Sequence, residues 1–328
     1  MILLHGWPGD RRDYDALVRL LVNEADVIVP DLRGFGESDK YQADAEEIYS
    51  GRGQANGVIA LLEELAIKGA VIGGYDVSSF VAQTVARIRP DLVRALVVSP
   101  PLPGAGKRVL ELKEAKEFWY ATLHQLTLAE ELVDGKAEAV RAYLRRFWEH
   151  WSGPTYVVDE SRLDHLAEMY SKPGAFTASM MWYRASGNPV MAYAQEEPPE
   201  RSNRLATPTT ILWQEHDVIF PIRWSDRLHE FFIDYKFERL SAPRAKSSFT
   251  ISTCPRRHAQ PSGVLMRSLS RTSDCDVTDR TTYEGQAGLR EAYNRSTIWP
   301  SDPEDPFPLG QNDTHSLDVR PIPRVMFT

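Results

Sequence analysis

Asp76 is the residue whose surroundings most clearly indicate chemistry, because small residues flank it on both sides. A sharp strand-to-helix turn can present a nucleophile when the residues two places before and after it are small. Gly74 and Ser78 occupy those places. If Ser78 were the nucleophile, the bulky Phe80 would crowd the turn. A carboxylate nucleophile attacks saturated carbon and forms an alkyl ester. The competing interpretation makes Asp76 a helix N-cap.

Two other stretches carry polar groups directly after predicted strands. His5-Gly6-Trp7-Pro8-Gly9 follows the first strand, and its simplest interpretation is a Pro-Gly turn. Asp217 follows a later strand, within Gln214-Glu215-His216-Asp217, and its alternative is a surface-loop carboxylate.

Short apolar runs and amphipathic stretches alternate in the first 240 residues, which is typical of an α/β fold with a parallel sheet covered on both faces. Strands are expected at Ile2–Leu4, Asp26–Pro30, Ala70–Gly74, Ala95–Ser99, Thr209–Trp213 and Lys236–Leu240. Helices are expected at Asp13–Val22, Gly57–Leu65 and Val77–Ile88.

The chain divides into four parts by pattern and composition. Residues 1–106 and 205–240 form the predicted core, and the aromatic-rich, helical segment 107–204 is predicted to be an inserted cap. Residues 241–328 form a tail with 27 apolar residues among 88, against 42% in the whole chain. We expect this tail to be irregular or disordered, because it shows no helical or strand period.

Composition excludes several classes of function. A net charge of -8 argues against a nucleic-acid partner, which requires a basic surface. No run of about 18 apolar residues and no signal peptide are found, which predicts a cytoplasmic protein with no membrane partner. Two cysteines form no disulfide framework, and no Cys/His spacing indicates zinc. We therefore expect no cofactor and no metal; the oligomeric state stays open.

Together, the His5-Gly6 loop, the run Asp31–Ser38, the Asp76 turn and Asp217 resemble the α/β-hydrolase fold, over roughly residues 1–240. An aspartate at the turn resembles the branch of epoxide hydrolases and haloalkane or haloacid dehalogenases. This resemblance implies a doubly wound, mostly parallel sheet with an inserted helical cap. It also implies an oxyanion hole from the backbone amides of Trp7 and Val77.

The same resemblance assigns roles to three further residues. Asp217 would orient a catalytic histidine and stabilise its charged form. Tyr183, in Trp182-Tyr183-Arg184, resembles the cap tyrosine that donates a hydrogen bond to an epoxide oxygen, and Tyr120 is expected to face the same pocket. The alternative is that these aromatic residues only pack within the cap.

The residues after the nucleophile narrow the substrate. Asp76-Val77-Ser78-Ser79-Phe80 contains neither the arginines of fluoroacetate-type dehalogenases nor the halide-binding tryptophan of many haloalkane dehalogenases. A small, apolar, neutral epoxide is therefore expected, opened to a diol through an ester on Asp76. The alternatives are a dehalogenase of the same fold and a catalytically inactive protein of this fold.

The family histidine is missing from its expected place near residues 242–247, where the sequence is Ala242-Pro243-Arg244-Ala245-Lys246-Ser247. His258 is the candidate replacement, against the alternative of an ordinary surface histidine. A reading-frame change near residue 240 would explain both the missing histidine and the change in composition. The resemblance further predicts two strands before Ile2 that this sequence does not contain.

Overall fold

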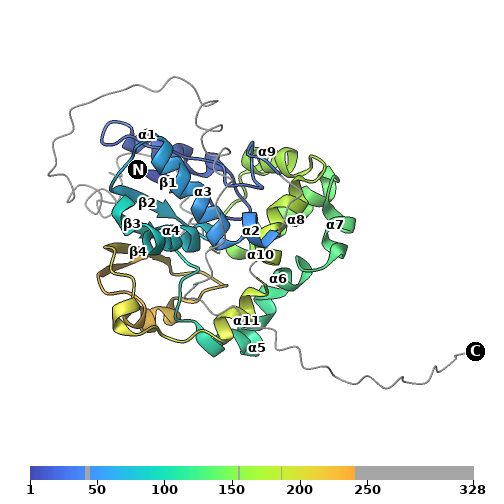
Figure 1. Ribbon diagram of the computed structural model, residues 1–328. Coiled ribbons are helices and arrows are strands. Elements are labelled where there is room, and N and C mark those ends of the chain that lie inside the picture. The colour runs from blue at the N-terminus through green and yellow to red at the C-terminus, as the bar shows by residue number, and fades with distance from the viewer. Residues whose placement is uncertain (41–44, 154–155, 186, 241–328) are drawn as a thin grey trace, which may run out of the picture. The chain divides into compact units, whose positions relative to one another are not determined.

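A parallel sheet forms the centre of the fold (Figure 1). The computed structural model describes residues 1–40, 45–153, 156–185 and 187–240, so the predicted tail 241–328, with His258, lies outside the described residues. Five strands in these ranges pair in parallel, in the order β1-β2-β3-β4-β5. They are β1 Ile2–Leu4, β2 Ala70–Gly74, β3 Val93–Val98, β4 Thr209–Gln214 and β5 Tyr235–Leu240.

Helices connect the strands and also fill a long segment between β3 and β4. The α-helices are α1 Asp15–Leu21, α2 Ala45–Tyr49, α3 Gly51–Glu64, α4 Val77–Ile88, α5 Leu112–Ala115, α6 Trp119–Leu123, α7 Thr127–Val133, α8 Ala137–Trp151, α9 Glu160–Tyr170, α10 Ala175–Ala185 and α11 Pro189–Ala194. The 3-10 helices are η1 Arg11–Tyr14, η2 Pro90–Leu92, η3 Gly106–Leu110, η4 Lys116–Phe118, η5 Arg201–Asn203 and η6 Ile222–Glu230. We call residues 99–208, which join β3 to β4, the helical insert.

Apolar side chains pack on both faces of the sheet. Ile2 and Leu4 lie in the larger core, together with residues of α3 and α4. Leu3 points to the other face and packs against Leu17 and Leu21 of α1. Because successive strand residues point to opposite faces, strands covered on both sides must be apolar throughout. This arrangement confirms the predicted α/β fold with helices on a parallel sheet.

Register brings the chemically interesting loops to one edge of the sheet. Leu4 pairs with Gly74, and Gly74 pairs with Val98. Strands β1 and β2 therefore end side by side, and the loops that follow them leave the sheet at the same edge. In open α/β sheets, this carboxyl edge is where ligands bind.

Most predicted elements are present. Strands Ile2–Leu4 and Ala70–Gly74 and helix Val77–Ile88 have the predicted bounds, and the other helices and strands differ at their ends. The strand predicted at Asp26–Pro30 is wrong: within it, only Ile28 forms a bridge, with Ile2. Pro30 has no N–H to donate, which limits pairing at this edge of the sheet.

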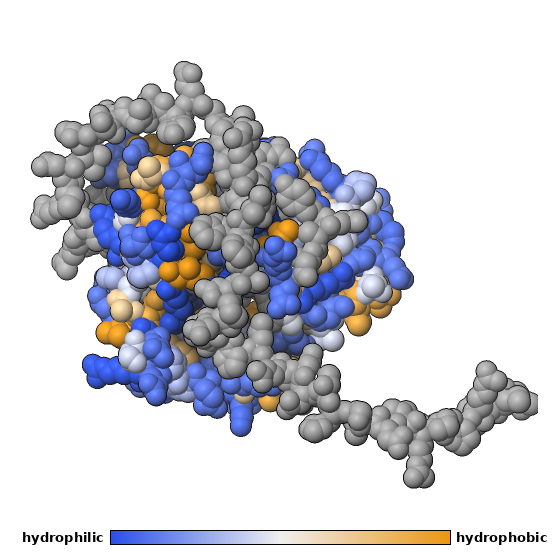
Figure 2. All heavy atoms as spheres, viewed as in Figure 1, coloured by the Kyte–Doolittle hydropathy of each residue, from blue (hydrophilic) through white to orange (hydrophobic). Residues whose placement is uncertain are grey.

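Hydrophilic side chains predominate on the visible part of the helical insert where α8 and α9 lie (Figure 2). Arg141 and Arg145 of α8 both form ion pairs with Glu160 of α9. Among the described residues, no helix is both long enough and apolar enough to span a membrane.

Gly74 is expected to be indispensable at the end of β2. A Cβ there would lie 2.5 Å from the carbonyl oxygen of Ser78, a backbone atom that cannot move aside cheaply. We predict that Gly74→Ala lowers the free energy of unfolding by about 1–3 kcal/mol, as overpacking does. Urea unfolding followed by circular dichroism measures the change.

Gly51→Ala is the matched control. A Cβ at Gly51 meets only the ring of Trp182, at 3.4 Å, and alanine favours the helix that begins there. Stability should be unchanged or higher. Equal losses in the two variants would contradict a special steric requirement at Gly74.

Candidate active site

Asp76 sits on a strained turn between β2 and α4. Its φ of 53° and ψ of -133° lie in a region that residues other than glycine rarely adopt. The turn is closed by hydrogen bonds from the Ser78 amide to the Tyr75 carbonyl (3.1 Å) and from the Ser79 amide to the Asp76 carbonyl (2.9 Å). Strain of this kind persists only where the surrounding structure enforces it, and it is frequent at active sites.

Two backbone amides face the Asp76 carboxylate. The Val77 amide donates to Oδ1 at 2.5 Å, and the Trp7 amide donates to the same carboxylate. The Val77 bond also makes Asp76 an N-cap of α4, as the competing interpretation expects, and this contact is compatible with a role as a nucleophile. The loop that carries Trp7 approaches closely because Gly6 has no side chain: a Cβ there would lie 2.6 Å from the Cβ of Asp76.

The surroundings of Asp76 disfavour its charge, although the side chain keeps partial access to solvent. Burial raises its pKa to about 7; the amides of Val77 and Trp7 oppose the shift, and the charge of Asp217 adds to it. Among the described residues, no cationic side chain contributes to this balance. A carboxylate that is poorly solvated and unpaired is a stronger nucleophile than one in water.

Asp217 lies in the loop after β4 and is buried, with 8% of its surface exposed. Its Oδ1 accepts hydrogen bonds from the amides of Ile219 (2.9 Å) and Phe220 (2.8 Å). Burial raises its pKa to about 6, against the effect of these two amides. Asp217 is therefore a buried acid close enough to influence Asp76, and not a surface-loop carboxylate.

Ser78 and His5, two other reactive residue types at this edge, are engaged in the structure. The Ser78 hydroxyl is fully buried and donates to the carbonyl of His5. Nε2 of His5 accepts from the amide of Leu32 (3.0 Å), and its Nδ1 lies 3.0 Å from the Gly6 carbonyl. These contacts hold the His5-Gly6 loop against the Asp31–Ser38 run, and they engage both ring nitrogens of His5.

Aromatic rings from the helical insert gather over Trp7. The ring of Tyr120 stacks on Trp7 with centroids 6.1 Å apart, and Tyr183 meets Trp7 edge to face at 5.9 Å. Tyr120 and Tyr183 lie 5.8 Å from each other, and the charge of Asp76 acts on both phenols. Burial raises the pKa of each phenol well above its usual value, so both keep their protons. In the described part of the chain, neither hydroxyl has a hydrogen-bond partner.

His124 is part of the same aromatic cluster, although it was not among the predicted site residues. It is fully buried, its ring lies 4.6 Å from Tyr183 and 4.9 Å from Trp7, and its Nε2 contacts the Tyr143 hydroxyl at 3.0 Å. Burial lowers its pKa to about 3, with the charge of Arg184 adding to the effect. His124 therefore stays neutral.

Among residues 1–40, 45–153, 156–185 and 187–240, no histidine forms a hydrogen bond with the Asp217 side chain. His150 bonds Glu117, His165 bonds Asp10 and His229 contacts the Asp226 carbonyl, while His216, the residue before Asp217, is exposed. His258 lies outside the described residues. Within the described part of the chain, no group of three or more metal-ligating side chains gathers.

An aspartate on a strained turn at the carboxyl edge of a parallel sheet, facing two amides, is the arrangement of a nucleophile elbow. The sequence matches the α/β hydrolase fold family over residues 1–243. The chain therefore belongs to the α/β-hydrolase fold family, and an epoxide hydrolase and a dehalogenase are among the proteins to which it is similar.

Two enzymes are similar to this chain over more than half of its length. The chain is 27% identical over 189 residues to the soluble epoxide hydrolase of Corynebacterium sp. (strain C12), covering 56% of this chain and 64% of that enzyme. It is 25% identical over 195 residues to the fluoroacetate dehalogenase of Burkholderia sp, covering 57% and 62%. The matched region is thus less than two thirds of either relative.

A solved structure shares the fold. The epoxide hydrolase of Bacillus megaterium, in complex with an inhibitor, superposes with a TM-score of 0.60 at 18% identity, covering 74% of this chain and 84% of that one.

The raised pKa of Asp76 predicts that the site limits stability at alkaline pH. A carboxyl whose folded pKa is above its unfolded value stabilises the fold at low pH, and this contribution is lost as the pH rises through the folded pKa. The loss for Asp76 falls between about pH 4 and pH 7. Asp76→Asn should therefore raise the melting temperature at pH 8 and change it little at pH 4, as measured by calorimetry.

Asp10→Asn is a control of opposite sign. Burial opposes ionisation of Asp10, but the charge and hydrogen bond of Arg162, with His165, outweigh it and lower the pKa to about 2. The stabilising effect of Asp10 is present above its unfolded pKa, so the substitution should lower the melting temperature at pH 8. If the melting temperature at pH 8 rose in both variants, or in neither, the charge balance described for Asp76 would be wrong.

Proposed function

We propose that this chain acts on epoxides through an alkyl ester on Asp76, as an epoxide hydrolase does. The observation that carries the proposal is the Asp76 carboxylate on its strained turn, with two tyrosine phenols from the helical insert close by. The insert then serves as the cap over the nucleophile.

The first step opens the epoxide. An Asp76 carboxylate oxygen attacks a ring carbon and forms an ester bond, while the C–O bond of the ring breaks and its electron pair goes to the epoxide oxygen. Tyr183 and Tyr120 supply hydrogen bonds to that oxygen and a proton to the alkoxide. Both phenols suit this role because each is protonated and without a partner among the described residues.

The second step hydrolyses the ester. Water attacks the Asp76 carbonyl carbon, a base takes the proton of the water, and the diol leaves as the carboxylate is restored. The amides of Trp7 and Val77, which face this carboxylate, would stabilise the negative charge on the tetrahedral intermediate. Asp217 would orient the histidine base, for which His258 is the sequence candidate.

The charges around Asp76 favour a neutral substrate. Among the described residues, no cation contributes to the pKa of Asp76, and Phe80 of α4 packs against Trp182 and Tyr193 at centroid distances of 6.4 and 6.1 Å. A carboxylate substrate would meet Asp76 and Asp217 without compensation. The proposed substrate is therefore a small apolar epoxide.

Styrene oxide tests the nucleophile directly. The wild-type chain should gain the mass of one styrene oxide, and Asp76→Asn should not. The rate should rise about tenfold from pH 6 to pH 8, because only the ionised carboxylate attacks and its pKa is about 7. Intact-mass spectrometry follows the adduct, and a diol assay of the solution reports whether the second step occurs.

Other outcomes separate the alternatives. An adduct without diol would mean that the elbow works and the base does not. Halide release from 1-bromobutane, with no adduct from styrene oxide, would favour a dehalogenase. No reaction with either reagent would favour an inactive protein of this fold.

Tyr183→Phe tests the role of the phenol. Without the hydroxyl, the alkoxide loses its acid, so we expect alkylation of Asp76 to slow about 100-fold. Tyr235→Phe, on β5 far along the sheet from the elbow, should react at the wild-type rate. Equal rates for Tyr183→Phe and wild type would assign Tyr183 to packing.

A further inference from the structure

The loop of residues 5–10, which carries the Trp7 amide, is bound by two helices of the helical insert. The Tyr170 hydroxyl, at the end of α9, accepts from the Gly9 amide (3.0 Å) and donates to the Gly9 carbonyl (2.9 Å). The Trp7 indole donates to the Ser179 hydroxyl of α10 (3.2 Å), which itself donates to the Phe176 carbonyl (2.7 Å). Tyr170 and Ser179 are 2% and 0% exposed, so water does not compete for these bonds.

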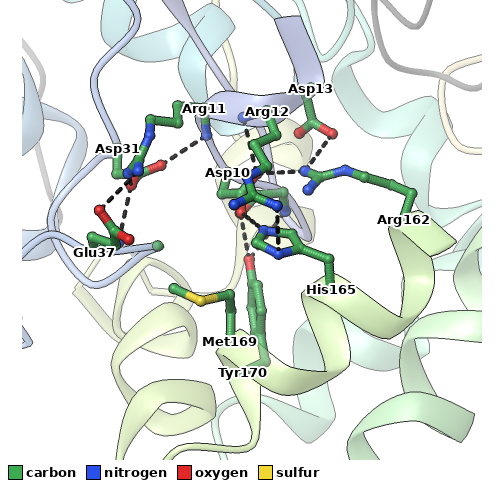
Figure 3. Close-up of polar contacts among 12 residues, drawn as sticks. Asp10, Arg11, Arg12, Asp13, Asp31, Glu37, Arg162, His165, Met169 and Tyr170 are labelled. Atoms are coloured by element: carbon green, nitrogen blue, oxygen red, sulfur yellow. Dashed lines mark hydrogen bonds and ion pairs between the residues drawn. The ribbon is translucent and has the colours of Figure 1, made fainter. Parts of the chain in front are cut away.

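Charged side chains also join α9 to the end of this loop and the residues just after it (Figure 3). Arg162 of α9 donates to Asp10 (2.5 Å) and to Asp13 (2.9 Å), and it is held in a largely buried position. His165 lies one turn further along α9 and bonds Asp10 through Nε2 at 2.6 Å. Its Nδ1 faces Arg12 at 3.0 Å, and since a guanidinium can only donate, Nδ1 accepts and Nε2 carries the proton.

The network also reaches the residue before the nucleophile. Asp13, bonded to Arg162, accepts a hydrogen bond from the Tyr75 hydroxyl at 2.5 Å. The same hydroxyl bonds the backbone of Gly6, and a Cβ at Gly9 would lie 3.0 Å from it. The loop is therefore enclosed between Tyr75 of the elbow and α9 of the insert.

We propose that Tyr170 and Ser179 are positioning residues, which hold loop 5–10 so that the Trp7 amide points at the Asp76 carboxylate. The loop contains no helix or strand; the contacts of His5 hold its first residues, and the bonds from the insert hold Trp7 and Gly9. Ser179 and Tyr183 lie four residues apart on α10 and share a face of that helix. One helix thus anchors Trp7 and presents the phenol, which fixes the oxyanion site and the acid relative to each other.

This inference rests on the proposed function for the role of the amide, but the contact itself can be tested without any reaction. Tyr170→Phe removes both bonds to Gly9 and keeps the ring. Hydrogen–deuterium exchange of peptides covering residues 5–10 should become at least tenfold faster. Tyr14→Phe is the matched control: its hydroxyl is also buried and donates to a backbone carbonyl, that of Leu4 (2.8 Å), which lies on β1 and outside the loop 5–10. Exchange of the loop should stay at the wild-type rate in that variant.

A kinetic measurement then tests positioning. The styrene oxide adduct is formed on each chain, excess reagent is removed, and breakdown of the ester is followed at pH 9. Tyr170→Phe and Ser179→Ala should each slow breakdown about tenfold, because a displaced amide stabilises the oxyanion less well. The styrene oxide concentration that gives half-maximal alkylation should not change in these variants. A general loss of structure would raise it.

The outcomes distinguish this inference from the proposed function. Unchanged exchange in Tyr170→Phe would overturn the inference, and so would faster exchange with ester breakdown at the wild-type rate. If the wild-type chain forms no adduct, the proposed function fails, and exchange then decides by itself whether α9 holds the loop.

Discussion

The structure depends on one constraint, the largely buried carboxylate of Asp76, which has no cationic partner among the described residues. Asp76 is held by the amides of Val77 and Trp7, while burial and the nearby Asp217 raise its pKa to about 7. Both amides are fixed by backbone geometry: one by the start of α4, the other by a loop that Gly6 allows to approach. Because of this charge, the free energy of unfolding should be lower at alkaline pH, and the proposed reactivity of Asp76 depends on the same charge.

Much of the rest of the fold serves to enforce that arrangement. Parallel strands β1 and β2 end at one edge, which sets the His5-Gly6 loop beside the elbow. Gly74 gives the turn the space it needs, and Ser78 ties the elbow to the His5 carbonyl. The helical insert then contributes what the sheet cannot supply, namely two protonated phenols and the contacts of Tyr170 and Ser179 with the loop.

Local sequence signals predicted the parts of this site that depend on local structure. Helix Val77–Ile88 and strand Ala70–Gly74 could be read from apolar pattern and glycine placement, and with them the turn at Asp76. The edge segment Asp26–Pro30 was overpredicted, because β-type residues do not show whether a partner strand extends alongside. The partners of Tyr170 and Arg162 could not be predicted, because they lie about 150 residues away in the chain and no local pattern marks such a contact. The position of His124 in the aromatic cluster could not be predicted for the same reason, because only the packing of distant residues shows which histidine is buried among aromatic rings.

The most direct test of the account asks which atom reacts. The chain would be alkylated with styrene oxide, freed of excess reagent and treated at pH 10 in water labelled with oxygen-18, and its peptides would be mapped by tandem mass spectrometry. The account predicts that the adduct lies on Asp76 and that one labelled oxygen enters its carboxyl group when the ester is cleaved. Alkylation confined to cysteine or histidine side chains, with no label in Asp76, would contradict it.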